Sequence, residues 1–212
     1  MINYYSIDKE IMNSIEINKS KFITYLFPIS DHEDFSMRLN DIRKEHPKAN
    51  HHCSAFILGH QQDQQKANDD GEPSGTAGYP MLDVLKTNSL TNIAAIVVRY
   101  FGGIKLGSGG LIRAYSTSVS GALNVAQRTA NVNQAIFELT IPYQNNDVFQ
   151  YFLGQTDLTI QELSVQYTDK VTYLIGLYEV DVETFSQEMN QRLNGNFQMQ
   201  FIQIKAINIF IE

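Results

Sequence analysis

The chain is poor in several features that would narrow its class at once, beginning with cysteine. Cys53 is the single cysteine among 212 residues, so neither an internal disulfide nor a multi-cysteine metal cluster is expected. No uninterrupted apolar run approaches the roughly 20 residues that a membrane-spanning helix requires. The first ten residues include Asp8, Lys9 and Glu10 and lack the apolar stretch of a secretion signal. We therefore expect a cytoplasmic protein whose fold is stabilised by packing alone.

The chain also lacks an excess of positive charge. Its formal net charge is −7, which argues against the broad basic surface that wraps nucleic acid. The imbalance is confined to one end, because residues 1–133 carry 13 basic and 13 acidic side chains whereas residues 134–212 carry 3 and 10. Two composition classes predict two domains, at 1–130 and 134–212, with the seam in the polar stretch 128–133.

Hydrophobic periodicity predicts an α+β first domain. Strands are expected at 11–17, 21–29, 52–59 and 93–100, and helices between a Ser30 or Asp31 cap and Pro47, at 78–87 and at 109–127. Residues 59–70 are rich in Gln, Asp and Asn, with almost nothing to bury. They predict a mobile surface loop, and whether it closes over a site as a lid is left open.

The second domain has a regular order of elements. The pattern predicts strands at 136–141, 159–167, 171–180 and 197–204, with helices at 145–154 and 182–193. The order β-α-β-β-α-β is the ferredoxin-like arrangement, in which two helices cover one face of a four-stranded sheet. The acidic character of this half also permits a different use, as a protein-docking module through its open sheet face or edge strand.

Two segments of the first domain predict recognition of a ligand. The run DDGEPSGTAG (69–78) gathers three carboxylates, Asp69, Asp70 and Glu72, among turn-forming residues, which is typical of a binding loop or of a solvated acidic turn. The run VRYFGGIKLGSGGLIRAY (98–115) predicts a strand, a glycine-rich turn and a helix. Such a turn presents backbone N–H groups and a positive helix end to an anion.

Three cations flank the glycine-rich turn, Arg99, Lys105 and Arg113. They could contact a phosphate or carboxylate, although the spacing matches neither of the known nucleotide-binding fingerprints. Tight packing of the helix on the strand would explain the same glycines. Tyr100, Phe101 and Tyr115 offer rings for base stacking wherever they are exposed.

The run ANHHCSAF (49–56) invites a metal site or a thiol nucleophile, and strand geometry argues against both. Adjacent His51 and His52 point to opposite faces of a strand, so they cannot share a metal without a bulge. We expect Cys53 to be a small buried residue. If His51 faces the 69–76 loop, it forms a pair with a carboxylate there that either binds ligand or transfers protons.

These segments resemble those of the IMPACT family of YigZ-type proteins. The runs DDGEPSGTAG and RYFGGIKLGSGGLIRAY match the signature of that family almost residue for residue. The resemblance covers essentially the whole chain. It implies an N-terminal domain like the second domain of a small-subunit ribosomal protein and a C-terminal domain similar to the last domain of elongation factor G. The signature positions are carried over as ligand-binding candidates: His51, Asp69, Asp70, Glu72, Ser74, Thr76, Arg99, Tyr100, Lys105 and Arg113.

The resemblance also implies a role in translation, because eukaryotic members restrain a stress kinase and bacterial members are described as translation-associated. We expect a regulatory binding protein that contacts RNA, the ribosome or a translation-related protein through its glycine-rich surface. No cofactor and no catalytic residue is assigned, a metal is left open, and no membrane partner is expected. The alternative is a hydrolase that uses His51 with Asp69, Asp70 or Glu72 as acid and base.

Overall fold

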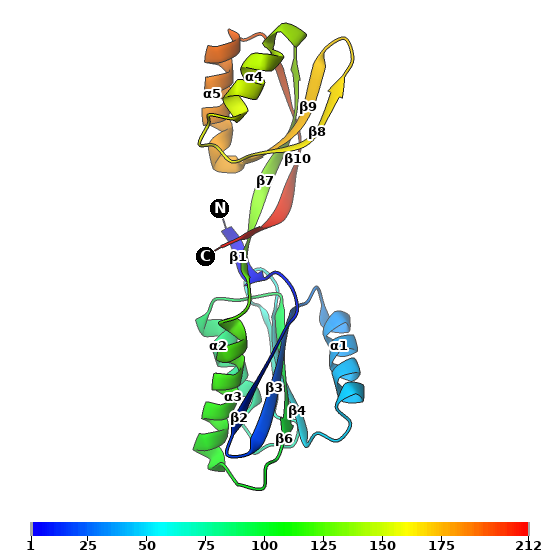
Figure 1. Ribbon diagram of the computed structural model, residues 1–212, viewed down its shortest axis with the longest axis vertical. Coiled ribbons are helices and arrows are strands. Elements are labelled where there is room, and N and C mark those ends of the chain that lie inside the picture. Colours follow the sequence, from blue (N-terminus) through cyan, green and yellow to red (C-terminus); the bar gives the residue numbers. More distant parts are fainter. Residues whose placement is uncertain (1, 212) are drawn as a thin grey trace. The chain divides into compact units, whose positions relative to one another are not determined.

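The computed structural model describes residues 2–211, which form two compact α+β units (Figure 1). The N-terminal unit contains residues 4–130 and 209–211, and the C-terminal unit contains residues 2–3 and 131–208. Strand β1 (Ile2–Ile7) begins in one unit and ends in the other. Within residues 2–211, no helix combines the length and apolarity needed to cross a membrane.

The N-terminal unit is a five-stranded sheet with helices on both faces (Figure 1). In spatial order its strands are β2 (Ile11–Ile17), β3 (Ser20–Pro28), β6 (Ile93–Tyr100), β4 (His51–Leu58) and β5 (Gln64–Asn68). Every neighbouring pair is antiparallel. Helices α2 (Gly78–Thr87) and α3 (Gly107–Leu123) cover one face, and α1 (His32–Glu45) covers the other.

Helices on both faces explain why β3, β4 and β6 are almost continuously apolar, since neither face of these strands meets water. Phe22, Met81 and Tyr115 are among the residues that fill the core beneath α2 and α3. Phe27 and Phe35 belong to a second core beneath α1.

Helix α1 begins where the sequence predicts. The Asp31 carboxylate accepts hydrogen bonds from the backbone N–H groups of Glu33 and Asp34, both at 2.9 Å. The bond from Asp34 holds the pKa of Asp31 below its ordinary value. Phe35 and Ile42 are buried, as their helical spacing predicts.

The C-terminal unit has the predicted element order β-α-β-β-α-β, but its sheet has five strands rather than the predicted four, because β1 also pairs with β7. Its elements are β7 (Arg128–Ile141), α4 (Asn146–Leu153), β8 (Ile160–Tyr167), β9 (Val171–Tyr178), α5 (Val182–Leu193) and β10 (Gln198–Phe210). Short 3-10 turns at Tyr143–Asn145 and Glu179–Asp181 precede the two helices. Strand β7 pairs with β1, β9 and β10, and β9 pairs with β8. Both helices lie on one face of the sheet (Figure 1).

The prediction of a mobile loop at 59–70 is wrong. Residues 64–68 form β5, which pairs antiparallel with β4 from Ser54 to Leu58. Its polar side chains are those of an edge strand, whose outer face meets water while its backbone completes the sheet. A segment held in the sheet by a strand ladder is not a lid.

The polar stretch 128–133 is not a break between elements, because β7 runs straight through it. Its asparagines pair with other side-chain amides: Asn3 Nδ2 donates to Asn131 Oδ1 at 2.9 Å and to Asn133 Oδ1 at 2.8 Å. These partners are 128 and 130 residues apart in the sequence. Local propensity disfavours Asn in strands, so the pairing with neighbouring strands, β1 and β10, keeps this segment extended.

Candidate functional site

A cavity of about 480 Å³ opens in the N-terminal unit between the sheet, the 69–77 loop and the start of α3. Its lining residues are Asn50, His51, Glu72, Pro73, Arg99, Phe101, Lys105, Leu106, Gly107, Ser108 and Leu111. Four of them, His51, Glu72, Arg99 and Lys105, are among the ten residues selected from the sequence.

The sheet register places three of the site's side chains in a row. Arg99 on β6 lies opposite Phe22 on β3 and opposite His51 on β4. Directly paired residues of antiparallel strands project from the same face. Phe22 belongs to the core beneath α2 and α3, so all three side chains lie on the face that α3 covers.

The 69–77 loop is held in place by Asp69. Its carboxylate accepts backbone hydrogen bonds from Gly75 at 2.8 Å, Ala77 at 3.0 Å and Gly78 at 2.8 Å. Asp69 therefore caps the start of α2 and closes the loop on itself. This closed loop directs the Glu72 side chain inward, and Glu72 is only 8% exposed.

Glu72 and Arg99 form a buried ion pair. Arg99 Nη1 donates to Glu72 Oε1 at 2.6 Å, and the Tyr115 hydroxyl donates to the same oxygen at 2.8 Å. Arg99 is 5% exposed, and its Cζ lies 5.4 Å from the centre of the Phe22 ring and 5.6 Å from that of Phe101. Removing both charges from water costs free energy that their attraction barely recovers.

One nitrogen of this arginine has no hydrogen-bond partner among residues 2–211. Arg99 Nη2 donates to the Ser20 hydroxyl at 3.4 Å, whereas the buried Nε has no hydrogen-bond partner among residues 2–211. Buried guanidinium donors are almost always paired. The unpaired Nε therefore marks a place where the chain supplies no acceptor of its own.

His51 is oriented by the backbone of the 69–77 loop. Its Nδ1 lies 2.8 Å from the Asp70 carbonyl oxygen, and because a carbonyl only accepts, Nδ1 is assigned the proton. The other ring nitrogen, Nε2, then carries the lone pair of the neutral ring and lies 3.8 Å from Glu72 Oε2. Two acceptors thus sit side by side in the cavity, a setting for proton transfer or for a ligand that donates.

Cys53 is a buried core residue, as predicted. It is 0% exposed, and its Sγ lies 3.0 Å from the Asp69 carbonyl oxygen and 3.2 Å from the Tyr115 hydroxyl. Burial raises the pKa of the Cys53 thiol and that of the Tyr115 hydroxyl. A thiol kept protonated is a poor nucleophile. Tyr115, also 0% exposed, is not available for base stacking.

The start of α3 forms the third wall of the cavity. Its N-cap is Leu106, which provides no side-chain cap, and the first turn contains no acidic residue. Gly107 adopts φ +69°, and Gly102 passes so close to β3 that a Cβ there would lie 2.0 Å from the Lys19 carbonyl carbon. The first-turn N–H groups beside exposed Lys105 and Ser108 are therefore left without an acceptor from a cap.

The other selected residues lie outside the cavity lining. Asp70 accepts from the His52 N–H at 2.7 Å and pairs with Arg43 at 3.0 Å. The Thr76 hydroxyl donates to the Pro73 carbonyl at 2.6 Å, and Ser74 is exposed. Tyr100 packs toward α1, where its hydroxyl lies 2.9 Å from His46 Nδ1, and Arg113 is exposed on α3.

Sequence reasoning missed Ser20, Phe22 and Asn50. Ser20 Oγ accepts from the Gly102 N–H at 3.2 Å, and Asn50 Oδ1 accepts from the Phe101 N–H at 2.8 Å. All three are of ordinary residue types, and Ser20 and Asn50 lie 82 and 51 residues from the backbone N–H groups that they bind. Nothing local in the sequence signals them.

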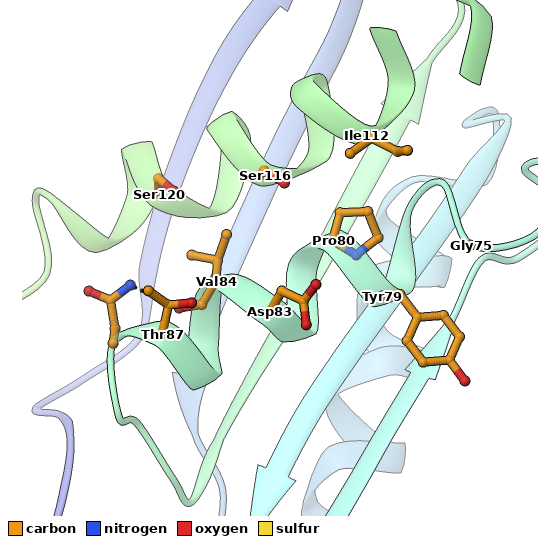
Figure 2. A pocket seen from close by; sticks show the side chains of 10 residues that line it. Gly75, Tyr79, Pro80, Asp83, Val84, Thr87, Ile112, Ser116 and Ser120 are labelled. Carbon is orange, nitrogen blue, oxygen red and sulfur yellow. Dashed lines mark hydrogen bonds between the residues drawn. The ribbon is translucent and has the colours of Figure 1, made fainter. Parts of the chain in front are cut away.

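A second cavity, of about 380 Å³, lies between α2 and α3 (Figure 2). Tyr79 and Asp83 line it from α2, and Ile112, Ser116 and Ser120 line it from α3 (Figure 2). Asp83 is its only charged lining residue. This second cavity contains neither a buried ion pair nor the start of α3, both of which line the first cavity. Across residues 2–211, no three His, Cys, Asp or Glu side chains converge in a metal-binding cluster.

The chain matches two known domain families in succession. The Impact N-terminal domain matches residues 18–123, and a domain of unknown function, DUF1949, matches residues 139–196. The chain is 38% identical over 193 residues to the IMPACT family member YvyE of Bacillus subtilis, covering 91% of this chain and 88% of that protein. It is 36% identical over 190 residues to YigZ of Escherichia coli, covering 89% and 92%.

One solved structure agrees with these matches at the level of fold. A crystal structure described as that of a hypothetical protein is 34% identical, with a TM-score of 0.59, and the match covers 96% of this chain and 98% of that one. The structure of the two-domain translational regulator Yih1 matches at 21% identity and a TM-score of 0.33, over 57% of this chain and 47% of that one. The latter likeness is too low to carry an argument.

Proposed function

The chain belongs to the IMPACT family, and we propose that it is a translation-associated binding protein that takes an anionic group, the phosphate of RNA, in the cavity at the start of α3. Under this proposal the protein contacts the ribosome or its RNA through the glycine-rich surface of the N-terminal unit. The observation that carries it is the uncapped first turn of α3 opening onto a cavity that Lys105 also lines.

Charge supports an anion at this place. Arg99 and Glu72 compensate each other, so Lys105 contributes the one uncompensated formal charge of the lining when His51 is neutral. The helix start adds a partial positive charge and free N–H donors. A single cation limits binding to a local contact rather than a long groove, in agreement with a chain of net charge −7.

The domain assignments are part of the same proposal, with domains at 1–130 and 134–212. The pairing of β7 with β9 and β10, the pairing of β8 with β9, and two helices on one face support a ferredoxin-like C-terminal domain similar to the last domain of elongation factor G, with β1 as an additional strand beside β7. The comparison of the N-terminal unit with the second domain of a small-subunit ribosomal protein rests on the family resemblance. Both comparisons favour a partner in translation.

The test is co-sedimentation of the full chain with ribosomes and with free RNA at low and moderate salt. Lys105→Ala is expected to weaken binding by about three- to tenfold, as the loss of one charge-assisted contact would. Lys86→Ala removes another exposed lysine, on α2 and outside the cavity lining, and is the matched control. Equal binding by the two variants would contradict the proposal.

A hydrolase is the second candidate, and the orientation of His51 is the observation that favours it. Asp69 and Asp70 are engaged in backbone and ion-pair contacts, which leaves Glu72 as the carboxylate beside Nε2. The third possibility, docking through the C-terminal sheet, is supported by exposed Ile202 and Ile204 on β10.

A further inference from the structure

The cavity at the start of α3 has the size of a small-molecule site. Its volume of about 480 Å³ lies within the roughly 300–1,000 Å³ of sites that enclose whole small ligands. Internal phosphates of an RNA strand are contacted by exposed side chains along its length. A ligand that reaches the buried Glu72 and Arg99 must instead enter the cavity end first.

Different walls of the cavity call for different chemical groups. The α3 wall offers N–H donors and the Lys105 ammonium, which suit an anion. The opposite requirement holds at His51 and Glu72, where Nε2 and Oε2, 3.8 Å apart, are both acceptors in the neutral-histidine state. Two acceptors suit a ligand hydroxyl or amino group, and the negative charge of Glu72 disfavours phosphate there.

Two further features point to a ligand rather than to an internal packing gap. Arg99 lines the cavity with a side chain only 6% exposed, and its Nε has no partner among residues 2–211. Phe101 also lines the cavity and is 45% exposed, so its ring is available to stack against a planar group. The first is a buried cation in the cavity wall whose hydrogen-bonding capacity the chain leaves unfilled, and the second is an aromatic surface that a ligand can cover.

From these features, and resting on the function proposed above, we propose that the cavity binds a nucleoside 5′-monophosphate group, either as a free nucleotide or as the 5′-terminal nucleotide of an RNA. The phosphate binds the first turn of α3 and Lys105. The 2′- and 3′-hydroxyls of the ribose donate to Glu72 and His51, one to each, and the base lies on Phe101. The ligand class thus follows from an anion, a hydroxyl donor and a planar ring within one cavity.

The experiment measures binding of defined probes to the full chain by titration calorimetry. The probes are adenosine 5′-monophosphate, its 2′-deoxy form, and one hexanucleotide RNA carrying either a 5′-phosphate or a 5′-hydroxyl. We expect the 5′-phosphate to strengthen RNA binding at least about tenfold, and the 2′-deoxy nucleotide to bind several-fold more weakly than its ribose form.

Ser108→Asp is the sharpest variant for this experiment. It places a carboxylate in the first turn of α3, where it favours the helix but repels a phosphate. The expected result is loss of the preference for the 5′-phosphate, with unchanged or higher stability. Ser108→Asn has the same shape without the charge and should retain the preference. Unfolding of the variant is thereby excluded as the cause.

The outcomes separate this inference from the proposed function. Equal binding of the two RNAs, weakened by Lys105→Ala, overturns the monophosphate site and leaves RNA binding intact. Binding of the free nucleotide without any RNA binding supports the site and overturns the RNA role. Equal affinity for ribose and deoxyribose forms overturns the contact with Glu72 and His51. Failure of every probe to bind overturns the monophosphate site, and co-sedimentation with ribosomes then decides the proposed function on its own.

Discussion

The interiors of the two units differ in kind. The core of the N-terminal unit contains a carboxylate and a guanidinium, Glu72 and Arg99, next to the buried Tyr115 hydroxyl. The core of the C-terminal unit is built on Phe149, Phe152 and Phe185. Among its described residues, the buried polar groups are two amides, Asn131 and Gln134, and the hydroxyl of Tyr173. No charged side chain is buried there among the residues described.

This difference indicates which unit contains buried groups that stability alone does not require. A buried ion pair is at best about as stabilising as apolar residues of similar volume. The C-terminal unit folds without such a pair, so packing of this kind of sheet does not need one. In the N-terminal unit the pair adjoins a cavity, which favours a role in binding over a role in folding.

Breaking the ion pair on one side should have the largest effect. Glu72→Leu leaves the Arg99 charge buried without a partner, and we expect the N-terminal unit to lose about 3–5 kcal/mol of unfolding free energy. The double variant Glu72→Leu/Arg99→Met removes both charges and should recover most of that loss. Urea unfolding, followed by hydrogen exchange in each unit, measures both.

A matched control for the ion pair exists in the other unit. Glu188 and Arg192 form an exposed pair on α5 at 3.3 Å, so Glu188→Gln should cost less than about 0.5 kcal/mol. A cost for Glu72→Leu as small as this would remove the contrast between the two interiors.

The stability of the C-terminal unit should depend on the volume of its aromatic core rather than on a buried ion pair. Phe185 is 0% exposed and packs 5.9 Å from the Phe152 ring, centre to centre. Phe185→Ala is expected to cost this unit about 3 kcal/mol or more through lost burial and a cavity. Exchange of β6 amides in the N-terminal unit should remain unchanged. Val180→Ala, at a position 72% exposed, is the control.

Asp69 tests whether the carboxylates of the 69–77 loop serve structure or chemistry. Asp69→Ala leaves three backbone N–H groups without their acceptor, and we expect a loss of about 1–2 kcal/mol in thermal or urea unfolding. Ser74→Ala, at an exposed position of the same loop, should change stability by less than about 0.5 kcal/mol. If Asp69→Ala left the stability unchanged, Asp69 would again be a candidate for acid–base chemistry.

The smallest expected effect is a pH dependence confined to the N-terminal unit. Burial lowers the pKa of His52, so the unfolded chain binds a proton first as the pH falls from the ordinary value of about 6.5. Stability is therefore lost as the pH falls through this range, by less than about 1 kcal/mol. His52→Gln should flatten that slope between pH 7 and 5.5 in urea unfolding, and an unchanged slope would show that other groups cause it.

Local patterns predicted most elements of both units. Helix α2, strand β6 and helix α5 begin and end where their periodicity places them, since each is a run of apolar residues at a fixed spacing with a clear stop signal. Strand β1 was not predicted, and strand β5 and the first half of β7 were also missed. Their polar residues are extended only because a neighbouring strand binds their backbone, and a partner distant in the sequence leaves no local signal.

The α+β class, the split in composition and the candidate residues of the site could all be predicted from the chain alone, because they follow from spacing, charge and turn chemistry near each position. Which of those residues share a cavity depends on the folded arrangement. It brought Glu72 to Arg99 and Tyr115 across 27 and 43 residues, and it engaged Asp69 and Asp70 with the backbone instead. A buried charge pairs with whichever opposite charge the packing of the core places beside it. That packing involves elements distant in the sequence, so no single stretch of the chain predicts it.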